Sequence, residues 1–218
     1  MRRVVVTGMG IWSCIGRNKE EVSASLHAGK SGIGYDEARK EYGFRSPLTG
    51  MVETPDLKAL LHRRLRTGMS QEAMYAYMAT REAFEQAGIE EQYLLDNEVG
   101  ILFGNDSTAL PTVEMHELML EKHDTALLGS GLIFQSMNST VNMNLSTIFH
   151  LRGINFSVSA AFVSHGSGGN HKLVYLGVVE VIIRYEFLYG NEVVYILQIR
   201  IAVSAEYIKD FIHKAIIL

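Results

Sequence analysis

Cysteine is almost absent from this chain of 218 residues, since Cys14 is the only one. A single thiol cannot form an internal disulfide bond, so nothing points to an oxidising compartment, and we expect a cytoplasmic protein. A basic excess is also lacking, because 20 Lys and Arg residues stand against 24 Asp and Glu residues, for a formal net charge of −4. Nucleic-acid-binding surfaces normally carry a basic excess, so we do not expect a nucleic-acid partner.

Long apolar runs are missing as well. No uninterrupted apolar stretch reaches the roughly 20 residues that are needed to span a bilayer. Even the apolar C-terminal part is broken by charged residues, among them Glu180, Arg184 and Glu192. The sequence therefore predicts no membrane-spanning segment, and its hydrophobic content of 47% is enough for the core of one globular domain or two small ones.

Histidines are present but are not grouped as metal ligands. His116 and His123 lie on one predicted helix, too far apart for the adjacent-turn pair of a helical metal site, and no third ligand is spaced to join them. We interpret them as solvated or packed side chains. The sequence shows no nucleotide or flavin site either, so we expect neither a metal nor a cofactor.

The elements that are present are typical of an α/β protein. The β-branched run from Val4 to Val6 predicts a strand buried on both faces and closed by a glycine turn at "TGMG". Asn18 is the predicted N-cap of a short helix that stops at Gly29. The clearest helix has Ser70 as N-cap and ends at Gly88. Five of its residues are spaced to share one buried face: Met74, Tyr77, Met78, Phe84 and Ala87.

Two more buried strands are predicted, at "EVGILFG" and "INFSVSAA", and two helices lie between them in the sequence. These helices are "PTVEMHELMLEKH" and "SMNSTVNMNLSTIFHLRG", the second ended by Gly153. From Tyr35 to Gly68 the pattern is irregular, which predicts a surface excursion that carries the basic cluster "LHRRLR". We expect the segments "VVV", "VGILF" and "INFSVS" to lie adjacent in one sheet.

Several stretches together resemble the β-ketoacyl-acyl carrier protein synthases of fatty-acid synthesis, which are condensing enzymes of the thiolase fold. The matching stretches run in the family's order from Arg3 to about Ala161: "RRVVVTGMGIWSCIG", "GKSGI", "EAFEQAGI", "VGILFG" and "MNSTVNMNLSTIFHLRGINFSVSAA". The resemblance implies an α/β fold in which residues 1–161 form one thiolase-like half of layered helices and a mixed sheet. It also implies an acyl carrier protein as partner, a homodimer through the strand from Asn155 to Ser159, and no cofactor.

In the resembled family, a cysteine follows a run such as "SAA" at the start of a buried helix and takes the acyl chain as a thioester. The matching position here is Phe162, whose phenyl ring offers no nucleophile. Cys14 matches a loop position where the family has no nucleophile, and we expect it to be a small buried hydrophobe. We therefore predict no catalytic residue in this chain.

Residues 162–218 depart from the family, and we predict that they form a separate, divergent segment rich in β-strand. "VSHGSGGNH" is poor in helix formers, and the block that follows is β-branched and aromatic with a plausible turn at Gly190 and Asn191. "EYIKDFIHKAIIL" then predicts a short amphipathic helix. The "HGSG" stretch at His165 resembles a family histidine motif that belongs to the second half, so we interpret it as coincidence.

The resemblance suggests four positions that line an acyl channel: Thr108, Gln135, Met137 and Phe162. The first three also have a purely structural interpretation, as a loop polar residue, a helix N-terminal residue and a core methionine respectively. Three functions stay open for the chain. It is a β-ketoacyl synthase that is inactive by itself, a non-catalytic partner subunit of an active synthase, or a truncated product with no selected function.

Overall fold

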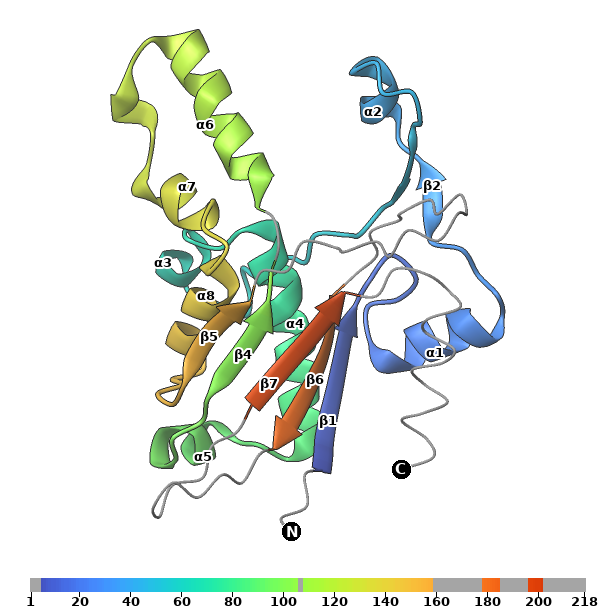
Figure 1. The fold of residues 1–218 in the computed structure, drawn as a ribbon, viewed down its shortest axis with the longest axis vertical. Coiled ribbons are helices and arrows are strands. Elements are labelled where there is room, and N and C mark those ends of the chain that lie inside the picture. Colours follow the sequence, from blue (N-terminus) through green and yellow to red (C-terminus); the bar gives the residue numbers. More distant parts are fainter. Residues whose placement is uncertain (1–4, 106–107, 159–177, 185–195, 202–218) are drawn as a thin grey trace, which may run out of the picture.

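The structure is a computed structural model, which describes residues 5–105, 108–158, 178–184 and 196–201. Its strands run side by side in one layer, with the longest helix packed behind them (Figure 1). The strands of this layer are β1 (Val5–Trp12), β4 (Ile101–Gly104), β5 (Asn155–Val158), β6 (Val178–Arg184) and β7 (Ile196–Ile201). The longest helix is α4 (Gln71–Ala87). Among the described residues, no helix is both long enough and apolar enough to cross a membrane.

Hydrogen bonding divides this layer into two sheets. β4 and β5 pair in parallel, whereas β1, β6 and β7 form an antiparallel sheet in the order β1-β6-β7. The predicted pairing of "VGILF" with "INFSV" is therefore confirmed, but the expectation that "VVV" lies adjacent to them is wrong. β6 takes the edge of β1, and β7 then lies beside β4 (Figure 1). The predicted β-rich character of the C-terminal segment is confirmed at β6 and β7.

β1 does not turn at its glycines, as the sequence suggested, but runs straight through them to Trp12. The reason lies on α4: a Cβ atom on Gly8 would stand 2.1 Å from the carbonyl oxygen of Ala83. Glycine at this position therefore serves the close approach of strand and helix, and not a turn. The strand is also not buried on both faces, because Val5 and Val6 are exposed.

α4 confirms its predicted ends, but only part of its predicted buried face, because Met74, Met78 and Ala87 are only partly buried. Ser70 caps it by accepting a hydrogen bond from the Ala73 N–H, and Gly88 ends it in the left-handed conformation at φ 65°. Tyr77 and Phe84 are buried as predicted, and both rings pack against Phe149. The most deeply buried side chains of the helix are small ones that the sequence analysis did not single out: Ala73, Ala76, Ala79, Thr80 and Ala83.

The remaining helices flank the sheets. α1 (Lys19–His27) has the predicted N-cap, since Asn18 Oδ1 accepts from the Glu21 N–H at 2.8 Å. The predicted surface excursion contains β2 (Ile33–Tyr35), α2 (Glu37–Glu41), β3 (Leu48–Gly50) and α3 (Arg63–Arg66), and β2 pairs antiparallel with β3. α2 and the β2–β3 pair stand away from the rest of the molecule (Figure 1).

α5 (Glu91–Asp96) precedes β4 in the chain. Between the two parallel strands lie α6 (Ala109–Lys122), the 3₁₀ turn η1 (Thr125–Leu127), α7 (Ser130–Gln135) and α8 (Thr140–Ile148). α7 was not predicted. α8 ends at Ile148, earlier than the predicted Gly153, and His150 then takes the left-handed conformation at φ 57°. The predicted boundary at Ala161, the Gly190–Asn191 turn and the C-terminal helix lie outside the described residues.

Candidate functional site

The candidate site lies where the two parallel strands β4 and β5 end. Ligands of parallel sheets bind outside the carboxyl ends of the strands, where the following loops present side chains. Asn105 follows β4 directly, and Thr108 stands just before α6. Both side chains are buried, each with 4% of its surface exposed. The residues that follow Val158 of β5 lie outside the described part of the chain.

A short segment between α7 and α8 is fastened to both strand ends by hydrogen bonds. The Thr108 hydroxyl donates to the Ser136 carbonyl at 2.9 Å. The Asn138 carbonyl accepts twice, from Asn105 Nδ2 at 3.0 Å and from the Ser157 hydroxyl at 3.2 Å. Loops fixed by several side-chain contacts hold their shape better than loops fixed by none, so this segment forms a firm wall beside the strand ends.

The four positions predicted from the sequence fall in different surroundings. Thr108 belongs to the wall, and Met137 lies within the fastened segment. Met137 is 41% exposed, so its interpretation as a core methionine is wrong. Gln135 ends α7 and does not begin a helix, and its Nε2 donates to the Thr67 carbonyl at 2.9 Å. Phe162 lies outside the described residues.

Comparison with known proteins decides the family. Residues 1–166 match the model of the β-ketoacyl synthase N-terminal domain. This chain belongs to the β-ketoacyl synthase family. It is 35% identical over 183 residues to 3-oxoacyl-[acyl-carrier-protein] synthase 1 of Buchnera aphidicola subsp. Acyrthosiphon pisum. The matched region makes up 81% of this chain and 45% of that relative. The corresponding enzyme of Escherichia coli K12 is 32% identical over 187 residues, or 84% of this chain and 46% of the relative.

Solved structures agree with the family. A β-ketoacyl synthase from Burkholderia phymatum superposes with a TM-score of 0.60 at 27% identity, over 72% of this chain and 39% of that one. The predicted α/β fold with a thiolase-like half is therefore confirmed. This chain spans a little under half the length of the curated relatives that it matches.

Sequence reasoning missed the buried amides of this synthase-family site. Asn142 is only 2% exposed and lies on α8 beneath β5. Its Nδ2 donates to Asn155 Oδ1 at 2.9 Å and to the Phe156 carbonyl at 2.8 Å, while its Oδ1 has no hydrogen-bond partner among the described residues. Asn144 Nδ2 donates to the Gly68 carbonyl at 3.1 Å and so fastens α8 to the start of α4. The asparagines in "VNMNL" were the available signal, because buried amides need partners.

The described part of this site offers hydrogen bonds but no activated nucleophile. The Thr108 hydroxyl donates to a carbonyl, which cannot accept a proton as a base would. Cys14 lies elsewhere, half-buried in a pocket after β1, so the expectation of a small buried hydrophobe is wrong. Burial raises the pKa of the Cys14 thiol, and its own backbone N–H opposes that effect only in part. Nowhere in the described ranges do three His, Cys, Asp or Glu side chains gather as metal ligands would.

Proposed function

We propose that this chain is the N-terminal half of a β-ketoacyl-acyl carrier protein synthase of fatty-acid biosynthesis, and that the chain alone does not catalyse condensation. The family and the names of the relatives support the first part of the proposal. The second part depends on one position. Phe162, which follows the last residue of β5 by four positions in the sequence, matches the position at which the resemblance places the nucleophilic cysteine. We further propose that the protein acts in the cytoplasm.

The chemistry of condensation explains why Phe162 matters. The nucleophilic thiolate attacks the acyl thioester of the carrier protein, the acyl chain moves to the enzyme sulfur, and the carrier thiol leaves. Malonyl carrier protein then loses carbon dioxide, and the resulting carbanion attacks the enzyme-bound thioester and releases the thiolate. A phenyl ring can neither form this thioester nor leave from it. The two histidines that assist decarboxylation belong, by the resemblance, to the second half of the family's fold.

The proposal is tested by offering acyl carrier protein and malonyl carrier protein to the purified chain and to a Phe162→Cys variant. Acyl transfer to protein and release of carbon dioxide are followed separately. A Phe44→Cys variant is the matched control, because Phe44 is an exposed phenylalanine on the distant excursion. We expect no elongation by any form, and acyl transfer at most to the Phe162→Cys variant. Elongation by the wild-type chain or by Phe162→Cys would overturn the proposal.

The β5 edge is the surface that we propose for a homodimer. Among the described strands, β5 pairs only with β4, so its other edge presents unpaired backbone groups. Phe156 and Ile154 beside this edge are 62% and 48% exposed. A two-fold axis through the edge would pair β5 with its own copy and cover both side chains.

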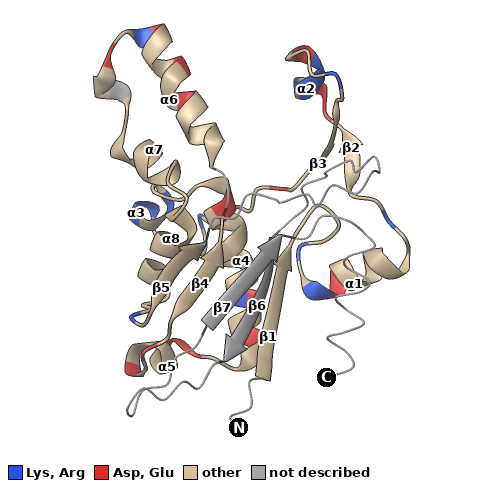
Figure 2. Cartoon of the chain, viewed as in Figure 1, with Lys and Arg blue, Asp and Glu red and all other residues tan. Residues whose placement is uncertain are grey.

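For the carrier protein we propose the basic surface of α3. Arg63, Arg64 and Arg66 lie on this short helix, which contains no carboxylate (Figure 2). The next residue, Thr67, accepts the hydrogen bond of Gln135, so α3 adjoins the segment that leads to the candidate site. Docking through these arginines requires an acidic face on the carrier, and its affinity falls as salt rises.

Two alternative functions of the chain predict different experimental outcomes. A non-catalytic partner subunit co-purifies with an intact synthase and changes the length of the acyl chains that the synthase makes. A product with no selected function is insoluble or rapidly degraded and binds neither synthase nor carrier protein. Co-expression of the chain with an intact synthase, followed by co-purification and measurement of the half-life, separates these two outcomes.

A further inference from the structure

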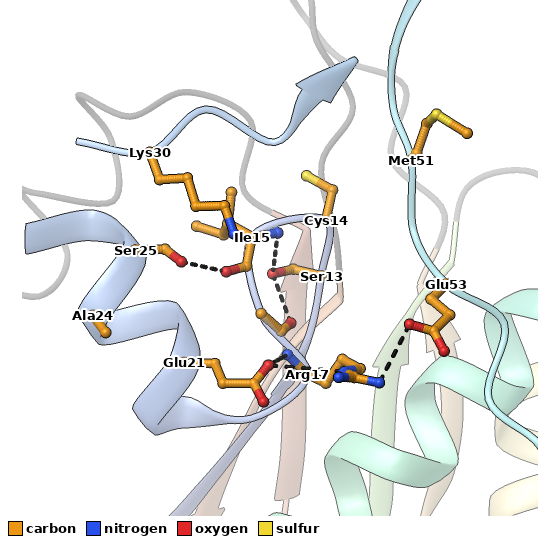
Figure 3. Close-up of a pocket in the computed structure, with 11 residues that line it drawn as sticks. Ser13, Cys14, Ile15, Arg17, Glu21, Ala24, Ser25, Lys30, Met51 and Glu53 are labelled. Atoms are coloured by element: carbon orange, nitrogen blue, oxygen red, sulfur yellow. Dashed lines mark hydrogen bonds and ion pairs between the residues drawn. The ribbon is translucent and has the colours of Figure 1, made fainter. Parts of the chain in front are cut away.

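A pocket of about 450 Å³ opens beside the carboxyl end of β1 (Figure 3). It lies between the turn that follows β1, the helix α1 and the segment that follows β3, and its volume is in the range of small-molecule sites. The residues used below are Ser13, Cys14, Ile15, Arg17, Lys30 and Met51. Its lining residues do not include Thr108, Gln135 or Met137, so the pocket is separate from the described part of the candidate site.

One wall of the pocket is a tight turn that is held by its own hydrogen bonds. The Ser13 N–H donates to the Gly16 carbonyl at 2.8 Å, and the Ser13 hydroxyl accepts from the Ile15 N–H at 3.3 Å. Ser25 of α1 donates to the Ile15 carbonyl at 2.6 Å. A wall that is fixed before a ligand arrives lowers the entropy lost on binding.

The opposite wall is fixed to the same strand. The indole N–H of Trp12, at the end of β1, donates to the Glu53 carbonyl at 2.8 Å. The Glu53 carboxylate also pairs with Arg17 Nη1 at 3.3 Å, so the two walls are joined across the pocket (Figure 3). Together these contacts set the width of the pocket.

The charged side chains of the pocket are not all paired within it. Both carboxylates are engaged by Arg17, because Glu21 accepts its backbone N–H at 2.8 Å and Glu53 its guanidinium. Lys30, in contrast, forms no ion pair with any described residue. Its backbone N–H is anchored to the Ser25 carbonyl at 2.8 Å, and its side chain extends toward Ile15 (Figure 3). The formal charges of Arg17, Lys30, Glu21 and Glu53 cancel, but the Lys30 ammonium has no carboxylate partner among the described residues and stands next to an apolar side chain.

We propose that this pocket binds a small organic anion, with a carboxylate or phosphate group at the Lys30 ammonium and a short apolar chain against Ile15 and Met51. A charge next to an apolar surface selects a ligand with both features, because an inorganic ion leaves the apolar surface wet and a neutral chain leaves the ammonium unpaired. The Cys14 thiol is the only one in the chain and lines the same pocket, so it reports occupancy directly.

The experiment measures the rate at which iodoacetamide alkylates Cys14 in the intact chain. Butyrate and monobutyl phosphate are added as anionic probes, and butyramide serves as the uncharged analogue of butyrate. We expect at least one anion to slow the alkylation in a saturable manner and butyramide to have little effect, and the stronger anion identifies the preferred group. Equal protection by butyramide, or no protection by either anion, overturns the proposal.

Variants of Lys30 test the role of its charge. Lys30→Met should weaken the protection roughly three- to fivefold, the size expected for an exposed ion pair, and Lys30→Arg should retain it. Lys58→Met removes an exposed lysine outside the pocket and is the matched control. Circular dichroism checks that each variant is folded. Protection of Lys30→Met equal to that of the wild-type chain contradicts the proposal.

Discussion

Gly10 of β1 faces Ala79 of α4 so closely that a Cβ atom on the glycine would stand 1.8 Å from the Ala79 carbonyl oxygen. The obstacle is helix backbone, which cannot rotate away as a side chain would. Strand and helix must therefore separate if any side chain is introduced at this position.

Gly10→Ala should lower the free energy of unfolding by about 3 kcal/mol, because it forces β1 away from α4. Gly34→Ala is the control, since its Cβ would meet only Met51 Sδ at 3.8 Å, and the expected change is less than about 1 kcal/mol. Urea unfolding followed by circular dichroism measures both. Equal stability of the two variants would show that strand and helix are not in close contact in solution.

Glu82 of α4 joins β1 to the start of α1. Its Oε2 accepts from the Ile11 N–H at 2.8 Å, and its Oε1 accepts from the Lys19 N–H at 2.7 Å. Glu82→Gln replaces one acceptor by an NH₂ group that faces an N–H donor, so we expect a loss of about 1.5–3 kcal/mol of stability. The matched change Glu85→Gln, at an exposed position of the same helix, should alter stability by no more than about 0.5 kcal/mol. The same denaturation experiment distinguishes them.

The alkylation of Cys14 should depend on pH in a way that reflects its burial. Desolvation raises the pKa of the folded thiol above its ordinary value, so less thiolate is present at a given pH than in the unfolded chain. We expect the rate to rise at a higher pH in the folded protein than in the same protein in urea. A raised folded pKa also stabilises the fold at low pH, and this contribution is lost as pH rises through the folded pKa. Coincident pH profiles would contradict this prediction.

The proposed dimer depends on Phe156 at the edge of β5. Phe156→Glu places a charge at the centre of the proposed interface, where it would lie close to its own symmetry mate, so we expect a monomer. Phe44→Glu changes an exposed phenylalanine on the distant excursion and should leave the oligomeric state unchanged. Sedimentation velocity compares both variants with the wild-type chain. A wild-type dimer that survives Phe156→Glu would place the interface elsewhere.

The sequence by itself determined those features that depend on neighbouring residues. The N-caps Asn18 and Ser70 and the left-handed Gly88 were predictable because capping involves atoms within a few residues. The strands "VGILF" and "INFSV" were recognisable from their apolar runs, and the family from several stretches in order. The prediction that "INFSV" is buried was wrong, because residues 154–157 are exposed. The absence of a thiol at position 162 is likewise a fact of sequence.

The tertiary structure decided what depends on distant partners. Gly8 and Gly10 looked like a turn because nothing near them in sequence reveals the α4 backbone against which they pack. β6 takes the edge of β1 through hydrogen bonds between segments far apart in the chain. The wall at Thr108 and Asn138 forms only because the loops after α7 and β4 meet. Local signals fix caps and strands, whereas strand order and close packing are set by contacts that local patterns do not encode.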